Sequence, residues 1–178
     1  MQATRATDLE RGVSREAACA IFDELAPVSI EQLIGSWKGS GVPTGHPLDG
    51  MLESYGWHGK RFDTAEIVHP LVFKDGKWGL VPINPSYLPL KPVLRHAGFL
   101  RRPSVTGIAR RLLPIARTSD PQARLRMTEF RGVVTATMIY DSLPIHDVFR
   151  GIDDDTLLGL MDLRYTREPF FFLLRREG

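Results

Sequence analysis

The chain has 178 residues, of which 43% are hydrophobic and 25% charged, and this ordinary balance excludes a disordered or fibrous protein. Its 23 basic and 21 acidic side chains leave a formal charge of +2 without a clustered basic footprint, which predicts no nucleic-acid partner. A single cysteine excludes an intramolecular disulfide, and no apolar run is long enough to span a bilayer, so we expect a cytoplasmic protein without integral membrane association.

Residues 1–34 are predicted to form an N-terminal helical arm. After a polar, unpatterned stretch, Ser14 can cap a helix that stops near Pro27. Ser29 can cap a second, shorter helical turn. The chain then enters the motif Gly35-Ser36-Trp37-Lys38-Gly39, where the pattern changes to that of a strand.

The first strand is predicted from Gly35 to about Val42. Trp37 is its one large apolar anchor, and the flanking glycines allow another backbone or a bulky ring to approach closely. Residues 46–58 follow, and their larger apolar side chains fall along one helical stripe. These are Leu48, Met51, Leu52 and Tyr55. We expect residues 46–58 to form a helical insert, or lid, between two strands.

The pair Asp75-Gly76 is the strongest hairpin signal in the chain and joins strand candidates at 69–74 and 78–83. Residues 84–104 form a Pro-rich connection with four prolines. Because each proline removes a backbone donor, this stretch predicts an extended surface segment rather than a helix or an inner strand.

The second half, residues 105–178, is predicted to be a meander of strands. Short polar or glycine-bearing turns separate the candidates, as an up-and-down barrel requires. The candidates are 105–115, 123–130, 133–140, 145–152, 156–162 and 170–175. With the part at 35–83, this gives a mainly β fold in which residues 35–178 form a single antiparallel barrel of about nine or ten strands.

Two segments resemble known families. Leu33 to Phe73, with GSWKG, Thr44 to Asp49 (TGHPLD) and His69 to Phe73 (HPLVF), resembles the bacterial GXWXG family. Residues 124–177, with Glu129 to Gly132 (EFRG) and Pro144 to Arg150 (PIHDVFR), are similar to the uncharacterised domain that usually follows GXWXG. A Gly-x-Trp pattern on the first strand is also typical of lipocalins and other calycins.

The calycin resemblance implies roles for particular residues. Trp37 would close one barrel end beneath an arginine of the last strand, for which Arg175 and Arg176 are available, through a cation–π contact. The helical insert would cover the other end, as in intracellular fatty-acid-binding proteins. Methionine in such a lid suits ligands of variable shape.

The candidate ligand-binding residues are Trp37, Met51, Tyr55, Trp57, Phe73, Met138, Tyr140 and Arg150. Trp37 fits a structural anchor better than a ligand contact, whereas Tyr55 and Trp57 lie at the rim of the expected lid. An inward Arg150 together with Tyr140 could hold a carboxylate in an apolar cavity. A surface salt bridge from Arg150 to one of the aspartates at 153–155 is the open alternative.

These residues predict binding or carriage of a hydrophobic small molecule, such as a fatty acid or lipid-like metabolite. The alternative is a small-barrel enzyme, similar to a decarboxylase or cyclase, acting on an aromatic or polyketide-like acid through Tyr140, His146 and Arg150. The five histidines lack the spacing of a metal site, and no cofactor motif is present, so we expect neither metal nor cofactor. The oligomeric state is left open.

Overall fold

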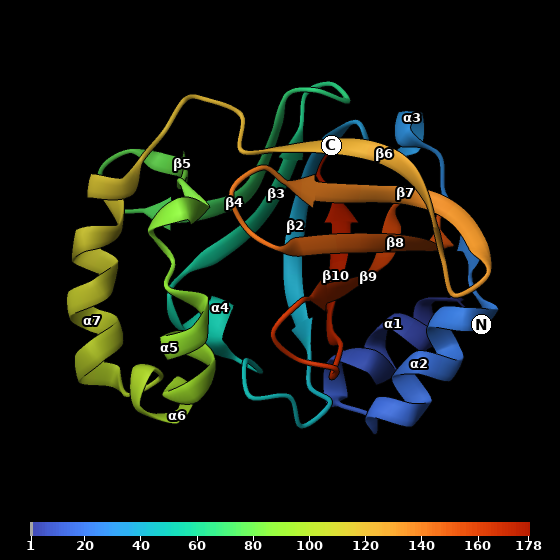
Figure 1. The fold of residues 1–178 in the computed structure, drawn as a ribbon, viewed down its shortest axis with the longest axis horizontal. Coiled ribbons are helices and arrows are strands. Elements are labelled where there is room, and N and C mark those ends of the chain that lie inside the picture. The colour runs from blue at the N-terminus through green and yellow to red at the C-terminus, as the bar shows by residue number, and fades with distance from the viewer. Residues whose placement is uncertain (1) are drawn as a thin grey trace.

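The computed structural model describes residues 2–178, and its centre is an antiparallel sheet that closes on itself (Figure 1). Eight strands form the barrel in the order β8-β7-β6-β4-β3-β2-β10-β9, and β9 pairs with β8 to complete the circle. The two outer strands, β1 and β5, pair with β8 and β4. Each barrel strand has a partner on both sides, although β4 and β6 meet at a single residue pair, Val68 with Ala123.

The ten strands are β1 (Ala26–Pro27), β2 (Gly35–Val42), β3 (Trp57–Phe62), β4 (Val68–Asp75), β5 (Gly79–Pro82), β6 (Ala123–Phe130), β7 (Val133–Tyr140), β8 (Ile145–Asp153), β9 (Thr156–Leu163) and β10 (Phe170–Arg176). The predicted strands at 35–42, 123–130 and 133–140 are confirmed to the residue. The hairpin at Asp75-Gly76 is also confirmed, because the Asp75 carboxylate accepts hydrogen bonds from the backbone N–H groups of Lys77 and Trp78.

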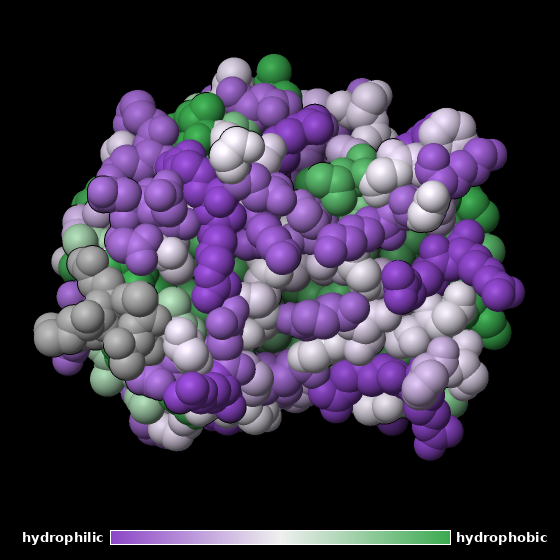
Figure 2. All heavy atoms as spheres, turned by 180° about the vertical axis from the view of Figure 1, so that it is seen from behind, coloured by the Kyte–Doolittle hydropathy of each residue, from purple (hydrophilic) through white to green (hydrophobic). Residues whose placement is uncertain are grey.

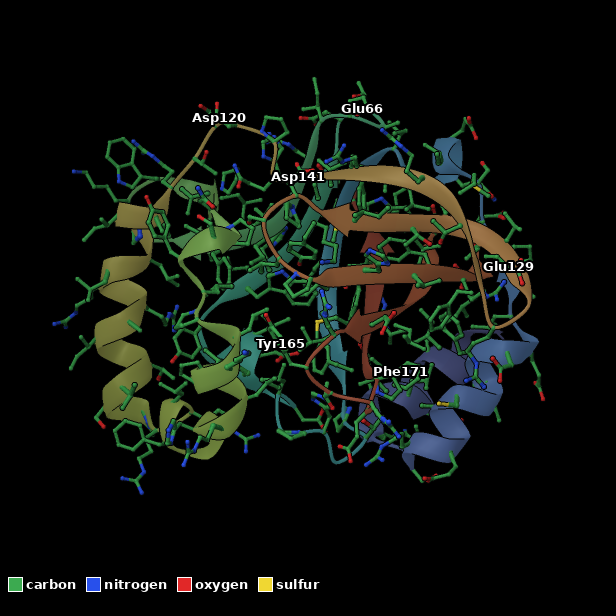
Figure 3. The ribbon with its side chains drawn as sticks, in the orientation of Figure 1. Glu66, Asp120, Glu129, Asp141, Tyr165 and Phe171 are labelled. Carbon is green, nitrogen blue, oxygen red and sulfur yellow. The ribbon has the colours of Figure 1, made fainter. Side chains whose placement is uncertain are left out.

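Helices α1 (Gln2–Arg11) and α2 (Arg15–Glu24) cover one outer wall of the barrel (Figure 1). Ser14 caps α2 as predicted, with its hydroxyl accepting from the backbone N–H of Ala17. On the barrel side, Phe171 points from β10 toward these helices (Figure 3), and its ring lies 6.2 Å from that of Phe22. The barrel is therefore lined with apolar side chains on its inside and, on this wall, on its outside as well.

Helix α1 was not expected, since residues 1–13 look polar and unpatterned. Its contribution to the outer core comes from Ala6 and Leu9, and Leu9 is fully buried. Two apolar positions give too short a pattern for sequence reasoning to identify a helix. The short turn α3 (Ile30–Leu33) was expected, and Ser29 and Gln32 form a reciprocal capping box at its start.

Residues 84–116 are helical, so the prediction of an extended connection at 84–104 and of a strand at 105–115 is wrong. The segment contains η1 (Pro85–Tyr87), α5 (Leu90–Arg95), α6 (Ala97–Leu100), α7 (Pro103–Leu112) and η2 (Leu113–Ala116). Pro85 and Pro103 stand at first helical positions, where the missing N–H has no helical partner in any case. The prolines begin these helices rather than prevent them.

The predicted helical insert at 46–58 is correct only in part. One turn, α4 (Met51–Ser54), is helical, and β3 already begins at Trp57. Helices α5–α7 supply the larger part of the cover, and together with α4 they lie over one end of the barrel (Figure 1). We call residues 46–56 and 84–116 the lid.

The outer side of the lid exposes Ile108, Leu112 and Ile115 on α7 and η2. Seen from behind, the molecule has a mainly polar surface on which hydrophobic residues show in separate small groups, some of them at the edge where α7 lies (Figure 2). Among residues 2–178, no helix is both long enough and apolar enough to cross a membrane.

Candidate functional site

A cavity of about 660 Å³ lies between the lid and the barrel interior. Small-molecule sites in proteins measure about 300–1,000 Å³, so this volume is in the usual range. The barrel contributes side chains from β3, β4, β7, β8, β9 and β10. These are Trp57, Lys60, Leu71, Phe73, Tyr140, Ile145, Asp147, Met161, Phe170 and Phe172. Nearly all of this lining is apolar.

The lid closes the cavity with apolar side chains from each of its parts. Met51 and Leu52 come from α4, Tyr55 directly follows that helix, and others, including Leu100 and Leu113, come from the segment 84–116. The Tyr55 hydroxyl donates a hydrogen bond of 3.0 Å to the carbonyl oxygen of Leu100. This bond ties α4 to α6, so the two parts of the lid are held together above the cavity.

Two aromatic rings in the cavity wall, those of Trp57 and Phe172, each pack directly against a glycine. Trp57 and Phe172 meet edge to face with ring centroids 6.1 Å apart. A Cβ at Gly39 would lie 2.1 Å from the Trp57 ring, and a Cβ at Gly159 would lie 2.3 Å from the Phe172 ring. The second glycine of the GSWKG motif is therefore needed because it makes room for Trp57.

One ion pair is buried in the cavity wall. The Lys60 ammonium lies 2.8 Å from Asp147 Oδ2 and donates a second hydrogen bond of 3.1 Å to the carbonyl oxygen of Pro70. Only 4% of Lys60 and 1% of Asp147 are exposed. Lys60 Nζ also lies 5.7 Å from the ring centroids of Trp57 and Tyr140, so aromatic faces surround the ammonium.

This environment shifts two pKa values. Burial raises the pKa of Asp147 above its ordinary value, although the neighbouring Lys60 charge opposes the shift. Burial, reinforced by the charge of Asp147, raises the pKa of Tyr140 well above its ordinary value. Tyr140 therefore keeps its proton at neutral pH, and the cavity presents a neutral phenol beside the ion pair.

The other end of the barrel is closed by Trp37. Its ring is fully buried, and its indole N–H donates to the carbonyl oxygen of Leu33 at 2.7 Å. The Arg176 guanidinium lies 4.3 Å from the ring centroid and donates to the carbonyl oxygens of Gln32 and Ile34. The expected stacking of a last-strand arginine on Trp37 is confirmed, and Arg176 is that arginine.

Five of the candidate ligand-binding residues line the cavity, namely Met51, Tyr55, Trp57, Phe73 and Tyr140. Trp37 and Met138 do not, because both are buried in the packed part of the inner core. The helices at 84–116, which form the larger part of the lid, were not predicted. Thr106, Ala109 and Leu113 have the spacing of one face of a helix, and this pattern could have identified α7.

The prediction of an inward Arg150 is wrong. Its guanidinium lies outside the barrel, 5.3 Å from the ring centroid of Phe22, and donates to the carbonyl oxygen of Phe130. His146 is also on the outer face, where it is exposed. Residues of β8 alternate between the two faces, and Asp147, in phase with Ile145, is the one that points inward. Tyr140, His146 and Arg150 therefore do not meet at one site.

Neither Lys60 nor Asp147 is among the candidate ligand-binding or catalytic residues predicted from the sequence. Lys60 lies in Gly59-Lys60-Arg61, which resembles a polar turn rather than a buried strand. Asp147 had a usable signal, since Ile145 and Phe149 on either side of it share one face of the strand. Among residues 2–178, no group of three or more His, Cys, Asp or Glu side chains is placed to hold a metal ion.

Comparison with known families divides the chain into two matched segments. Residues 20–77 match the GXWXG protein family, and residues 121–176 match a domain of unknown function, DUF4334. Strands of the GXWXG segment pair with strands of the DUF4334 segment, β2 with β10 and β4 with β6, so the two matched segments build one closed barrel.

A crystal structure of a protein from Thermomonospora curvata is similar to this chain over its whole length. The two share 28% sequence identity with a TM-score of 0.73, and the match covers 99% of each chain. No curated protein matches the sequence.

His46 is expected to make stability depend on pH. Its ring is buried against Phe170, its Nδ1 accepts the backbone N–H of Leu48, and burial lowers its pKa below the ordinary 6.5. At a pH between the lowered pKa of His46 in the folded protein and its ordinary value in the unfolded chain, the unfolded chain binds more protons than the folded protein. The free energy of unfolding therefore falls as pH drops below about 6.5. Denaturant titrations across this range should show a shallower decline for His46→Asn, which keeps an acceptor. His146→Asn, at an exposed site, should leave the decline unchanged, and an equal effect of both variants would contradict the assignment.

Proposed function

We propose that this protein binds and carries a hydrophobic small molecule, such as a lipid-like metabolite, inside its barrel. The observation that carries the proposal is the apolar cavity of about 660 Å³ beneath the lid. Burial of apolar ligand surface in such a cavity would supply most of the affinity, at about 25 cal/mol per Å². A closed end at Trp37 and a helical cover at the other end agree with a calycin-type container.

Extraction of the purified protein with organic solvent, followed by mass spectrometry, tests the proposal directly. We expect an enriched apolar compound, and we expect the neutral fluorescent probe N-phenyl-1-naphthylamine to bind and to be displaced by fatty alcohols or fatty acids. If no apolar compound is enriched and the probe does not bind, the proposal is wrong.

Filling the cavity should abolish binding. Leu71 lines the cavity from β4, so Leu71→Trp places a larger side chain in the space meant for the ligand. We expect probe affinity to fall by about tenfold or more, which corresponds to roughly 1.4 kcal/mol. Leu80→Trp makes the same change at a half-exposed position of β5 and should bind the probe normally. Equal binding by the two variants would place the site elsewhere.

The second candidate, an enzyme acting on an aromatic or polyketide-like acid, now needs a different set of groups. Two of the three expected residues, His146 and Arg150, lie outside the barrel. The buried acid–base pair Lys60–Asp147 beside Tyr140 is the observation that keeps this candidate. Mass spectra that show a bound compound converted over time, with loss of conversion in Asp147→Asn, would favour it over carriage.

A further inference from the structure

Two polar side chains that line the cavity each have a buried atom without a hydrogen-bond partner in the described residues. Asp147 Oδ1 and Trp57 Nε1 are buried, and neither has a hydrogen-bond partner among residues 2–178. Lys60 donates to Asp147 Oδ2 and to the Pro70 carbonyl oxygen, which uses two of its three N–H groups. Trp57, Lys60 and Asp147 all line the cavity, so its wall contains one unpaired acceptor and one unpaired indole donor on residues that contact the Lys60 ammonium.

A buried polar atom without a hydrogen-bond partner destabilises the folded protein, unless a bound molecule supplies the partner. A ligand hydroxyl both donates and accepts, so it can donate to Asp147 Oδ1 while accepting from Trp57 Nε1–H or Lys60. A ligand carbonyl can accept from the same donors. The wall thus matches an oxygen function on an otherwise apolar molecule.

The charge of the site argues against an ionised head group. Lys60 and Asp147 lie 2.8 Å apart and neutralise each other, and they are the lysine and the carboxylate that line the cavity. A ligand carboxylate would lose its hydration and meet the Asp147 charge, with no uncompensated cation to receive it. The arginine expected to serve that purpose, Arg150, is outside the barrel.

We propose that the Lys60–Asp147 pair, with Trp57 Nε1–H, is the recognition site for an uncharged hydroxyl or carbonyl group of a hydrophobic ligand. This inference rests on the proposed function and narrows its ligand class to neutral lipid-like molecules, in preference to ionised fatty acids.

The test compares three molecules with the same chain: dodecan-1-ol, dodecanoic acid and dodecane. Each is titrated at neutral pH against the protein loaded with N-phenyl-1-naphthylamine. We expect the alcohol to displace the probe at about tenfold or more lower concentration than the acid or the alkane. If the acid binds as well as or better than the alcohol, the inference is overturned while the proposed function stands. If neither the probe nor any of the three binds, both are overturned.

A double variant then links the preference to the pair. In Lys60→Met/Asp147→Leu, both charges are replaced by apolar groups of similar volume, a change that buried pairs often tolerate. We expect this variant to bind the probe but to prefer the alcohol over the alkane by no more than about twofold. The matched control is Arg124→Met/Asp141→Leu, which removes an exposed ion pair with 2.8 Å between its charged atoms and should retain the full preference. Retention of the preference by the Lys60/Asp147 double variant would overturn the inference.

Discussion

Replacing Asp147 by alanine is expected to lower the free energy of unfolding by about 3–5 kcal/mol, because it leaves the Lys60 ammonium buried without its counter-charge. The pair is 4% and 1% exposed, so water cannot take over the role of the lost carboxylate without opening the cavity wall. Urea denaturation followed by circular dichroism measures the change. A loss below about 1 kcal/mol would mean that the pair behaves as a surface ion pair.

Two further variants separate charge from packing at this position. Lys60→Met/Asp147→Leu should recover most of the stability that Asp147→Ala loses, since it removes both charges and fills the volume. The exposed pair Arg124–Asp141 provides the reference, and Arg124→Met/Asp141→Leu should cost about 0–1 kcal/mol. If the Lys60/Asp147 double variant is as unstable as Asp147→Ala, lost packing rather than unpaired charge explains the effect.

Trp37→Ala is expected to destabilise the protein by about 3–5 kcal/mol, the range for removal of a buried aromatic side chain. The ring is fully buried, and its loss also removes the indole hydrogen bond to Leu33 and the platform on which Arg176 stacks. Thermal and chemical denaturation should both show the loss.

Trp78 offers a matched comparison for Trp37. It is 53% exposed and its ring also has an arginine above it, with the Arg117 guanidinium 4.7 Å from the ring centroid. Trp78→Ala should cost less than about 1 kcal/mol, because an exposed cation–π contact contributes only about 0.5–1 kcal/mol. Similar losses at the two positions would show that Trp37 is not a structural plug.

The sequence predicted most of the barrel because local signals determined its strands. Alternation and short turns located β6 and β7 to the residue, and Asp75-Gly76 located the hairpin. The lid was mispredicted because its prolines were interpreted as breakers along the whole segment, whereas Pro85 and Pro103 begin helices. β3 was missed because Gly59, at a φ of +158°, approaches the Trp37 backbone so closely that the strand lacks a normal apolar pattern.

The site was predicted less well than the fold. Residues with a local signal, such as Tyr55 and Trp57, do line the cavity. The pairing of Lys60 with Asp147 joins residues 87 positions apart, and only the closed sheet brings them together. The orientation of Arg150 was predicted wrongly because alternation does not tell which face of a strand points into the barrel. On β8 both faces are packed against apolar groups, so the sequence pattern does not distinguish them.

The position of Trp37 and of the lid has a kinetic consequence for a ligand of the proposed kind. The cavity lies beneath the lid, and Trp37 is buried in the inner core apart from the cavity lining, so a ligand would pass most directly beneath the lid. The lid is held by the Tyr55 hydrogen bond to Leu100 and by the Arg101 hydrogen bond to the Asp49 carbonyl oxygen. For a ligand of the proposed kind, loosening these bonds would speed arrival and departure together and leave the affinity unchanged, whereas a change in the contacts deep in the cavity would alter the departure rate and the affinity. The lid would then control the speed of exchange, and the cavity wall the affinity.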